Sequence, residues 1–178
     1  AARRRISGRV VISARLPKYL LMSLSVYQFA HSPYCLPITR ALEALGVPHE
    51  IRNISNADRR EVISLTNGAY YQVPVLEHDG RVIFESGTDT LDVAHYVDGQ
   101  FANGRLFPAE QEGLQRLVIN HLEDDVEGVT FRLVDPPYIA RISDIVERTM
   151  IIRHKERKFD RGCVGDWAAR RDELTHKA

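Results

Sequence analysis

The segment "HSPYC" (residues 31–35) places an imidazole, a hydroxyl and a thiol between a β-rich run and a helical pattern. Pro33 suits the first position of a helix, which makes Ser32 the natural N-cap. The unpaired N–H groups and the dipole of a helix start favour an anion, such as a thiolate, beside this turn. One charge-assisted hydrogen bond from the Ser32 hydroxyl, worth about 1.5–3 kcal/mol, lowers a thiol pKa by roughly one to two units. The segment therefore predicts either a thiolate-stabilising site or a plain serine cap.

Cys35 is the alternative reactive group in this segment. A thiol near a helix start can form a mixed disulfide, but a small core residue that faces a sheet is the simpler role. Cys163 is the second of only two cysteines and lies far along the chain. Two cysteines exclude a disulfide scaffold and a cysteine-based zinc site, so we expect no metal.

Three neighbouring residues are weaker candidates. Tyr27 precedes the turn by several residues, so core packing is favoured for it. His31 can supply a proton, although a turn position requires no function. Pro37 removes a hydrogen bond early in the helix and predicts a kink or an irregular first turn.

The surrounding pattern predicts the elements that position these groups. Alternating and helical spacings of apolar residues give the element types, and Ser32, Gly46, Asn56 and Ser86 are the expected caps and stops. The expected elements are a strand at 24–29, a helix at 33–46, a strand at 48–54, a helix at 56–67, a hairpin at 73–84 and a helix through 97. This βαβαββα order implies one mixed sheet with a parallel and an antiparallel pair.

The character of the chain changes near residue 105. A linker at 101–108 leads into an all-helical region at 109–178, where an apolar stripe runs from Leu114 to Val129. Pro136-Pro137 are expected to break the chain, and another helix is expected at 139–152. The last helix has barely begun when the sequence ends, so we expect an incomplete helical domain.

Composition and charge narrow the classes of function. Hydrophobic residues make up 44% and charged residues 27% of the chain, which is typical of a soluble globular protein. No apolar run approaches the length of a membrane span. Six basic residues and no acid lie in residues 1–22, so the remainder is acidic overall, which argues against nucleic-acid binding. Residues 1–22 are typical of a transit peptide or of a wrongly assigned start before Met22; we favour the second and a cytoplasmic protein.

The motifs and their order resemble the glutathione transferase superfamily. The resemblance rests on "SPYC" at the first strand–helix turn, "QVPVL" opening the hairpin and "ES" after it, with "HKERKFDRGC" similar to a block of bacterial members. It implies a thioredoxin-like α/β domain at 23–100 followed by an all-α domain. "SPYC" also resembles the glutaredoxin "CPYC" with its first cysteine replaced by serine.

The resemblance implies a glutathione cradle. Val73, which precedes a cis Pro74, would bind the cysteinyl backbone of glutathione, and Gln72 would reach its glycyl end. Ser86 would bind the γ-glutamyl carboxylate, and Glu85 would bind the α-ammonium group.

Three functions follow from the resemblance. In the first, Ser32 holds the glutathione thiolate, which attacks a small electrophile; Phe131, Tyr138 and the 114–129 stripe are candidates to border that pocket, although core packing is favoured for most. The second is a glutathione-dependent reductase or lyase that works through Cys35. The third is a non-catalytic binding module. Glutathione is the expected co-substrate, and a homodimer is the expected assembly.

Overall fold

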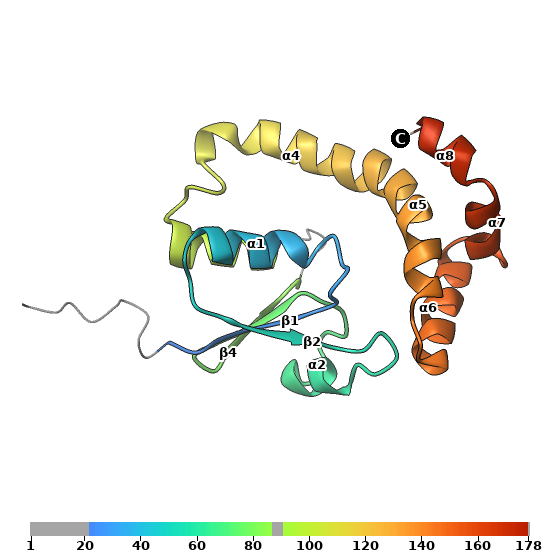
Figure 1. Cartoon of the computed structure of the whole chain (residues 1–178). Coiled ribbons are helices and arrows are strands. Elements are labelled where there is room, and N and C mark those ends of the chain that lie inside the picture. The colour runs from blue at the N-terminus through green and yellow to red at the C-terminus, as the bar shows by residue number, and fades with distance from the viewer. Residues whose placement is uncertain (1–21, 87–90, 178) are drawn as a thin grey trace, which may run out of the picture.

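A four-stranded mixed sheet forms the centre of the N-terminal half (Figure 1). The computed structural model describes residues 22–86 and 91–177, so residues 1–21 of the expected extension lie outside it. The strands are β1 (Leu24–Gln28), β2 (Glu50–Asn53), β3 (Val75–His78) and β4 (Arg81–Phe84), in the order β2-β1-β3-β4. β2 is parallel to β1, whereas β3 is antiparallel to both β1 and β4. This confirms the predicted thioredoxin-like arrangement.

The hairpin turn fixes the register of β3 and β4. Asp79 and Gly80 form a two-residue connection with positive φ angles of 49° and 79°, as tight hairpins with the native strand twist require. The Asp79 carboxylate accepts a hydrogen bond from the Ser23 N–H at 2.8 Å, which ties the hairpin to the start of β1. Met22, expected in the extension, packs against the adjoining core.

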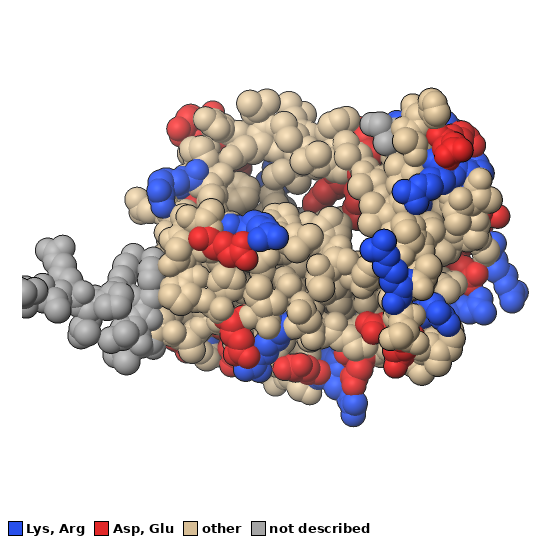
Figure 2. All heavy atoms as spheres, viewed as in Figure 1, with Lys and Arg blue, Asp and Glu red and all other residues tan. Residues whose placement is uncertain are grey.

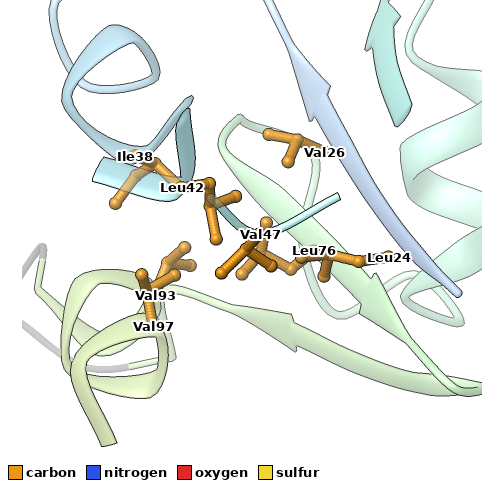
Figure 3. Packing of buried hydrophobic residues seen from close by; sticks show 8 residues of the cluster. All are labelled: Leu24, Val26, Ile38, Leu42, Val47, Leu76, Val93 and Val97. Atoms are coloured by element: carbon orange, nitrogen blue, oxygen red, sulfur yellow. The ribbon is translucent and has the colours of Figure 1, made fainter. Parts of the chain in front are cut away.

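Helices cover both faces of the sheet. α1 (Leu36–Ala44) and α3 (Asp92–Val97) cover one face, and α2 (Arg60–Leu65) covers the other (Figure 1). Figure 3 shows the first of these cores, in which side chains of α1 and α3 point toward those of β1 and β3. Its buried members are Leu24, Val26, Ile38, Leu42, Val47, Leu76, Val93 and Val97.

The start of α2 differs from the prediction. The helix begins at Arg60 with Arg59 in the N-cap position, so the prediction that Asn56 caps it is wrong. Asn56 instead donates from its backbone N–H and its side chain to Glu147 Oε1, at 3.1 and 3.3 Å. Its polar groups thus serve a contact with the helical region, which the local sequence could not reveal.

The connection between the two halves is folded against the first. After α3 the chain continues as a π-helical turn (Asp98–Ala102), and the buried Asp98 carboxylate accepts hydrogen bonds from the N–H groups of Leu106 and Phe107. Phe101 and Leu106 pack against the α1–α3 core. Residues 101–108, expected to be a plain linker, are therefore attached to the N-terminal half.

The described helical region contains α4 (Glu112–His121), α5 (Glu127–Ala140), α6 (Ile145–Lys158), α7 (Cys163–Ala169) and α8 (Arg171–Lys177). A short 3-10 turn (Ala109–Gln111) precedes α4, and a π-helical turn (Leu122–Val126) joins α4 to α5. No helix among residues 22–86 and 91–177 is long and apolar enough to cross a membrane.

Pro136 and Pro137 lie inside α5, so the prediction that they break the chain is wrong. A proline keeps a helical φ angle and removes only its own N–H, which leaves the carbonyl four residues earlier without its helical donor. α5 packs against α6, α7 and α8, and this packing maintains the helix across both prolines. The helix expected at 139–152 is instead divided, because the Asp144 side chain accepts from the Glu147 N–H at 2.7 Å and caps a new helix.

The apolar stripe of α4 is exposed, although core packing was favoured for it. Figure 2 shows that the surface is hollowed between α4 and the N-terminal half. The exposed large apolar residues of this stripe are Leu114, Leu117, Val118, Leu122 and Val126. The helical spacing identified a helix correctly but could not show which side of it would be covered.

We expect Leu42→Ala to lower the free energy of unfolding by about 2–5 kcal/mol, because Leu42 is fully buried between α1 and the sheet. Urea unfolding monitored by circular dichroism measures this. Leu114→Ala is the matched control, since Leu114 is 65% exposed and its loss should cost about 0.5 kcal/mol or less. Equal losses in both variants would contradict the assigned core.

Candidate functional site

The turn between β1 and α1 is built around the backbone of Ser32. Its carbonyl accepts hydrogen bonds from the N–H groups of Cys35 and Leu36, at 3.2 and 3.1 Å. Its hydroxyl oxygen accepts from the Tyr34 N–H at 3.3 Å. α1 itself begins at Leu36 with Cys35 in the N-cap position, so the prediction that Ser32 caps the helix is wrong. Ser32 instead closes the turn that precedes α1.

Pro37 explains part of this offset. It occupies the second position of α1, where a backbone N–H has no intrahelical acceptor and its loss carries no hydrogen-bond cost. Residues 33–35 form a turn and not regular helix, which matches the expected irregular start.

Cys35 is buried inside this turn. Its side chain is fully inaccessible and shares a cluster with Val62, Val73 and Val75. Burial raises the pKa of its thiol, while hydrogen bonds with the Ser32 side chain and the Phe29 backbone lower it. Burial is the larger effect, so the thiol stays protonated at neutral pH. This environment suits a packed thiol better than an exposed nucleophile.

Strand pairing brings Val73 and Pro74 to the base of the turn. Val75 pairs with Tyr27 across β1 and β3, so the two residues before Val75 lie beside the chain as it leaves β1. Val73 and Pro74 are buried, and the peptide bond between them is cis. Segments separated by more than 40 residues in sequence thus share one edge of the sheet.

Glu85 and Ser86 make reciprocal contacts with the start of α3. The Glu85 carboxylate accepts from the N–H groups of Asp92 and Val93, at 2.7 and 3.3 Å. The Ser86 N–H and hydroxyl both donate to Asp92 Oδ2, at 2.8 and 2.9 Å. The prediction that Ser86 caps the third helix is therefore wrong, because Glu85 supplies the capping carboxylate and Leu91 occupies the N-cap position.

This arrangement shows that Ser86 binds a carboxylate. Its two donors converge on one oxygen of Asp92, and an anion near the start of α3 also benefits from the helix dipole. The carboxylate present is the chain's own. Residues 87–90, between the two partners, lie outside the described residues.

Arg59 is a site residue that the sequence analysis missed. Its guanidinium donates to the Tyr71 carbonyl at 3.2 Å and to Gln72 Oε1 at 3.1 Å, and it lies 4.2 Å from the centre of the Phe29 ring. A positive charge thus stands beside Gln72, just before the Val73–Pro74 bond. The sequence did not single out Arg59, because "DRR" at the start of a helix is a common surface pattern.

Tyr70 is a second missed residue. Its ring stacks on Phe84 with centroids 5.4 Å apart, and it packs against the cluster that contains Cys35. Burial, with the negative charge of Glu85 as a smaller cause, raises its pKa to about 12. The Tyr70 phenol is therefore neutral at neutral pH.

The helical region reaches the turn through α5. Tyr34 Oη donates to Glu127 Oε2 at 2.7 Å, and the His31 ring lies against Tyr138 with centroids 4.1 Å apart. Burial lowers the pKa of His31, and the charge of Asp135 opposes this effect. Tyr138 therefore borders the turn, as one of the predicted pocket residues.

Two other predicted residues lie elsewhere. Phe131 packs against Phe159 and Trp167 in the core of the helical region, with ring centroids 5.2 and 5.6 Å away. Tyr27 is buried, and its hydroxyl donates to Glu77 at 3.0 Å, which confirms the core role favoured for it.

The charged run at residues 153–161, "RHKERKFDR", is not wholly exposed, because Lys155 is half-buried and its Nζ pairs with Asp135 Oδ2 at 2.6 Å. Figure 2 shows other Lys and Arg side chains exposed over the helical half. In the described part of the chain, no group of three or more His, Cys, Asp or Glu side chains is placed to hold a metal.

Comparison with known proteins agrees with this geometry. Residues 26–105 match the family model described as the glutathione S-transferase N-terminal domain. Residues 26–105 thus belong to the family of glutathione S-transferase N-terminal domains. The matched residues run from β1 through α3 and its connection, so they contain the β1–α1 turn (the thiol turn, residues 29–35), the cis peptide bond and the Glu85-Ser86 pair.

Individual relatives extend this finding. A probable glutathione S-transferase from Nicotiana tabacum is 28% identical over 103 residues, which are 57% of this chain and 44% of the tobacco protein. The chain thus matches less than half of that relative's length.

Solved structures show the same fold. Glutaredoxin 2 from Salmonella typhimurium, in complex with glutathione, superposes with a TM-score of 0.62 at 23% identity, over 87% of this chain and 67% of that one. A tau class glutathione S-transferase from mango, Mangifera indica, gives a TM-score of 0.52 at 16% identity, over 74% and 57%. At these identities the likeness concerns the fold.

We expect Glu85→Ala to lower the free energy of unfolding by about 1–2 kcal/mol, because it removes the carboxylate that accepts two N–H groups at the start of α3. Chemical denaturation measures the change. Glu43→Ala is the control, since the exposed Glu43 forms a surface ion pair with Arg40 and its loss should change stability by about 0.5 kcal/mol or less. A neutral Glu85→Ala variant would refute the capping role.

Proposed function

We propose that the chain binds glutathione at the β1–α1 turn and transfers its thiolate to a small electrophile. The observation that carries this proposal is the buried Ser32 side chain in the β1–α1 turn, at the end of the sheet where the cis Val73–Pro74 bond also lies. The match of residues 26–105 to the glutathione S-transferase N-terminal domain supports the choice of ligand.

The reaction needs little from the protein. The glutathione thiol loses its proton to solvent, and the resulting thiolate accepts a hydrogen bond from Ser32. The thiolate sulfur then forms a bond with an electrophilic carbon as the leaving group departs with its electron pair. One such hydrogen bond lowers the thiol pKa by roughly one to two units, which makes the thiolate abundant at neutral pH.

The rest of the cradle orients the tripeptide. Val73 offers its N–H and C=O to the cysteinyl backbone, as an edge strand would. Gln72 and the neighbouring Arg59 suit the glycyl end, where Arg59 supplies the positive charge that a carboxylate needs. Ser86 receives the γ-glutamyl carboxylate in place of Asp92, and Glu85 meets the α-ammonium group.

Reduction or lysis through Cys35 is the less favoured chemistry. A nucleophilic cysteine needs exposure and a depressed pKa, whereas Cys35 is fully buried and its pKa is raised. A binding module without turnover is the other alternative, and the activity measurement below separates it from an enzyme. A homodimer in the cytoplasm is the setting that we expect, and sedimentation analysis would test the assembly.

We expect the chain to bind glutathione in calorimetry, and Ser86→Ala to weaken that binding by roughly 10-fold through the loss of a hydroxyl donor to a carboxylate. Ser64→Ala, on the exposed side of α2, is the control and should bind as the natural chain does. A folded natural chain that binds no glutathione would refute the proposal.

We expect Ser32→Ala to reduce kcat/KM for conjugation of glutathione to a chlorodinitrobenzene by roughly 10- to 100-fold, because the thiolate loses its hydrogen-bond donor. Cys35→Ala should keep activity within about threefold after correction for folded fraction. The reverse pattern would favour the reductase. Binding without turnover in any variant would favour the binding module.

A further inference from the structure

Tyr34 links the thiol turn to α5, because its backbone contacts the turn and its side chain contacts the helix. Its backbone N–H donates to Ser32 Oγ at 3.3 Å, and its phenol donates to Glu127 Oε2 at 2.7 Å. Glu127 is the first residue of α5 and is half-buried. The Glu127 carboxylate, in the helical region, therefore constrains Tyr34, whose backbone N–H contacts the Ser32 hydroxyl.

A second contact lies on the other side of Ser32. The His31 ring packs against Tyr138, which stands near the other end of α5. Tyr138 lies eleven positions after Glu127, so the two contacts are about 16 Å apart along the helix axis. One helix thus holds the turn at two points that flank Ser32.

The Ser32 hydroxyl is directed by this arrangement. A hydroxyl has one donor hydrogen and two acceptor lone pairs. Ser32 Oγ accepts the Tyr34 N–H with one lone pair, and its other lone pair can accept the S–H of the protonated Cys35 thiol, which leaves the hydroxyl hydrogen to donate to another group. Pro33 has no N–H to give to the turn, so the position of Tyr34 matters more than in a turn without proline.

We propose that α5 positions the Ser32 hydroxyl through Glu127 and Tyr34, with His31–Tyr138 as the second point of attachment. Glu127, Tyr34 and Tyr138 are then positioning residues, and the catalytic consequence rests on the glutathione transferase function proposed above. The consequence for the turn itself holds whether or not glutathione is the ligand.

The first test compares Tyr34→Phe and Glu127→Gln with the natural chain. The readout is the ultraviolet absorbance of thiolate in the glutathione complex across pH. We expect the pKa of the bound thiol to rise, kcat/KM to fall roughly 10-fold and the KM for glutathione to change by less than about twofold. In a Ser32→Ala background neither substitution should change the thiol pKa further, because both act through Ser32.

Tyr96→Phe is the matched control. Its hydroxyl also makes a 2.7 Å hydrogen bond, to His78 Nδ1, but between α3 and β3. It should leave the thiol pKa and kcat/KM unchanged. Tyr138→Leu alters the second point of attachment and should shift the thiol pKa in the same direction as Tyr34→Phe.

The second test needs no glutathione. The chain has two buried cysteines, Cys35 in the turn and Cys163 in the helical core. Alkylation with a maleimide, resolved by peptide mass spectrometry, reports how often each becomes accessible. Tyr34→Phe and Glu127→Gln should accelerate alkylation of Cys35 by roughly 10-fold and leave Cys163 unchanged.

The thiol-pKa test and the alkylation test together distinguish the positioning role of α5 from the proposed glutathione function. Unchanged alkylation of Cys35 in both variants, or equal acceleration at both cysteines, would overturn the positioning role. A natural chain that binds no glutathione would refute the proposed function, and alkylation would still decide whether α5 holds the turn.

Discussion

Antiparallel pairing between β1 and β3 is the constraint on which the site depends. Because Tyr27 faces Val75, the end of β1 and the start of β3 meet at one edge of the sheet. The thiol turn extends from the first and the cis Val73–Pro74 bond precedes the second. β4 and the Glu85-Ser86 pair follow from the same register, since the hairpin is only two residues long. A slip of one residue would turn Val75 and Leu76 to the wrong faces and separate these groups.

Much of the N-terminal half could be predicted from the sequence, because its signals are local. The apolar run at Leu24, the Asp79-Gly80 turn and the Gly46 stop each act within a few residues. Helix starts were harder. Asn56 and Ser86 have the right side chains for caps, but Asn56 is used by Glu147 and Ser86 by Asp92. Competition from distant partners is not visible in a local pattern.

The helical region departs further from its pattern for the same reason. Two adjacent prolines oppose a helix locally, and the packing of α5 against its neighbours prevails over them. Site residues divide in a similar way. Val73, Pro74 and Ser32 stand in recognisable motifs, whereas Arg59, Tyr70 and Glu127 acquire their places only when separate segments pack together.

The serine in the turn also bears on how the chain withstands oxidants. Peroxide attacks thiolates, and the sulfenic acid that forms can proceed to irreversible products. In this turn the first position of the motif carries the hydroxyl oxygen of Ser32, which peroxide does not oxidise in this way, and the Cys35 sulfur is buried and protonated. Damage at Cys35 therefore requires the turn to open first. Peroxide that would oxidise an accessible cysteine thiolate at this position therefore leaves Ser32 itself unchanged.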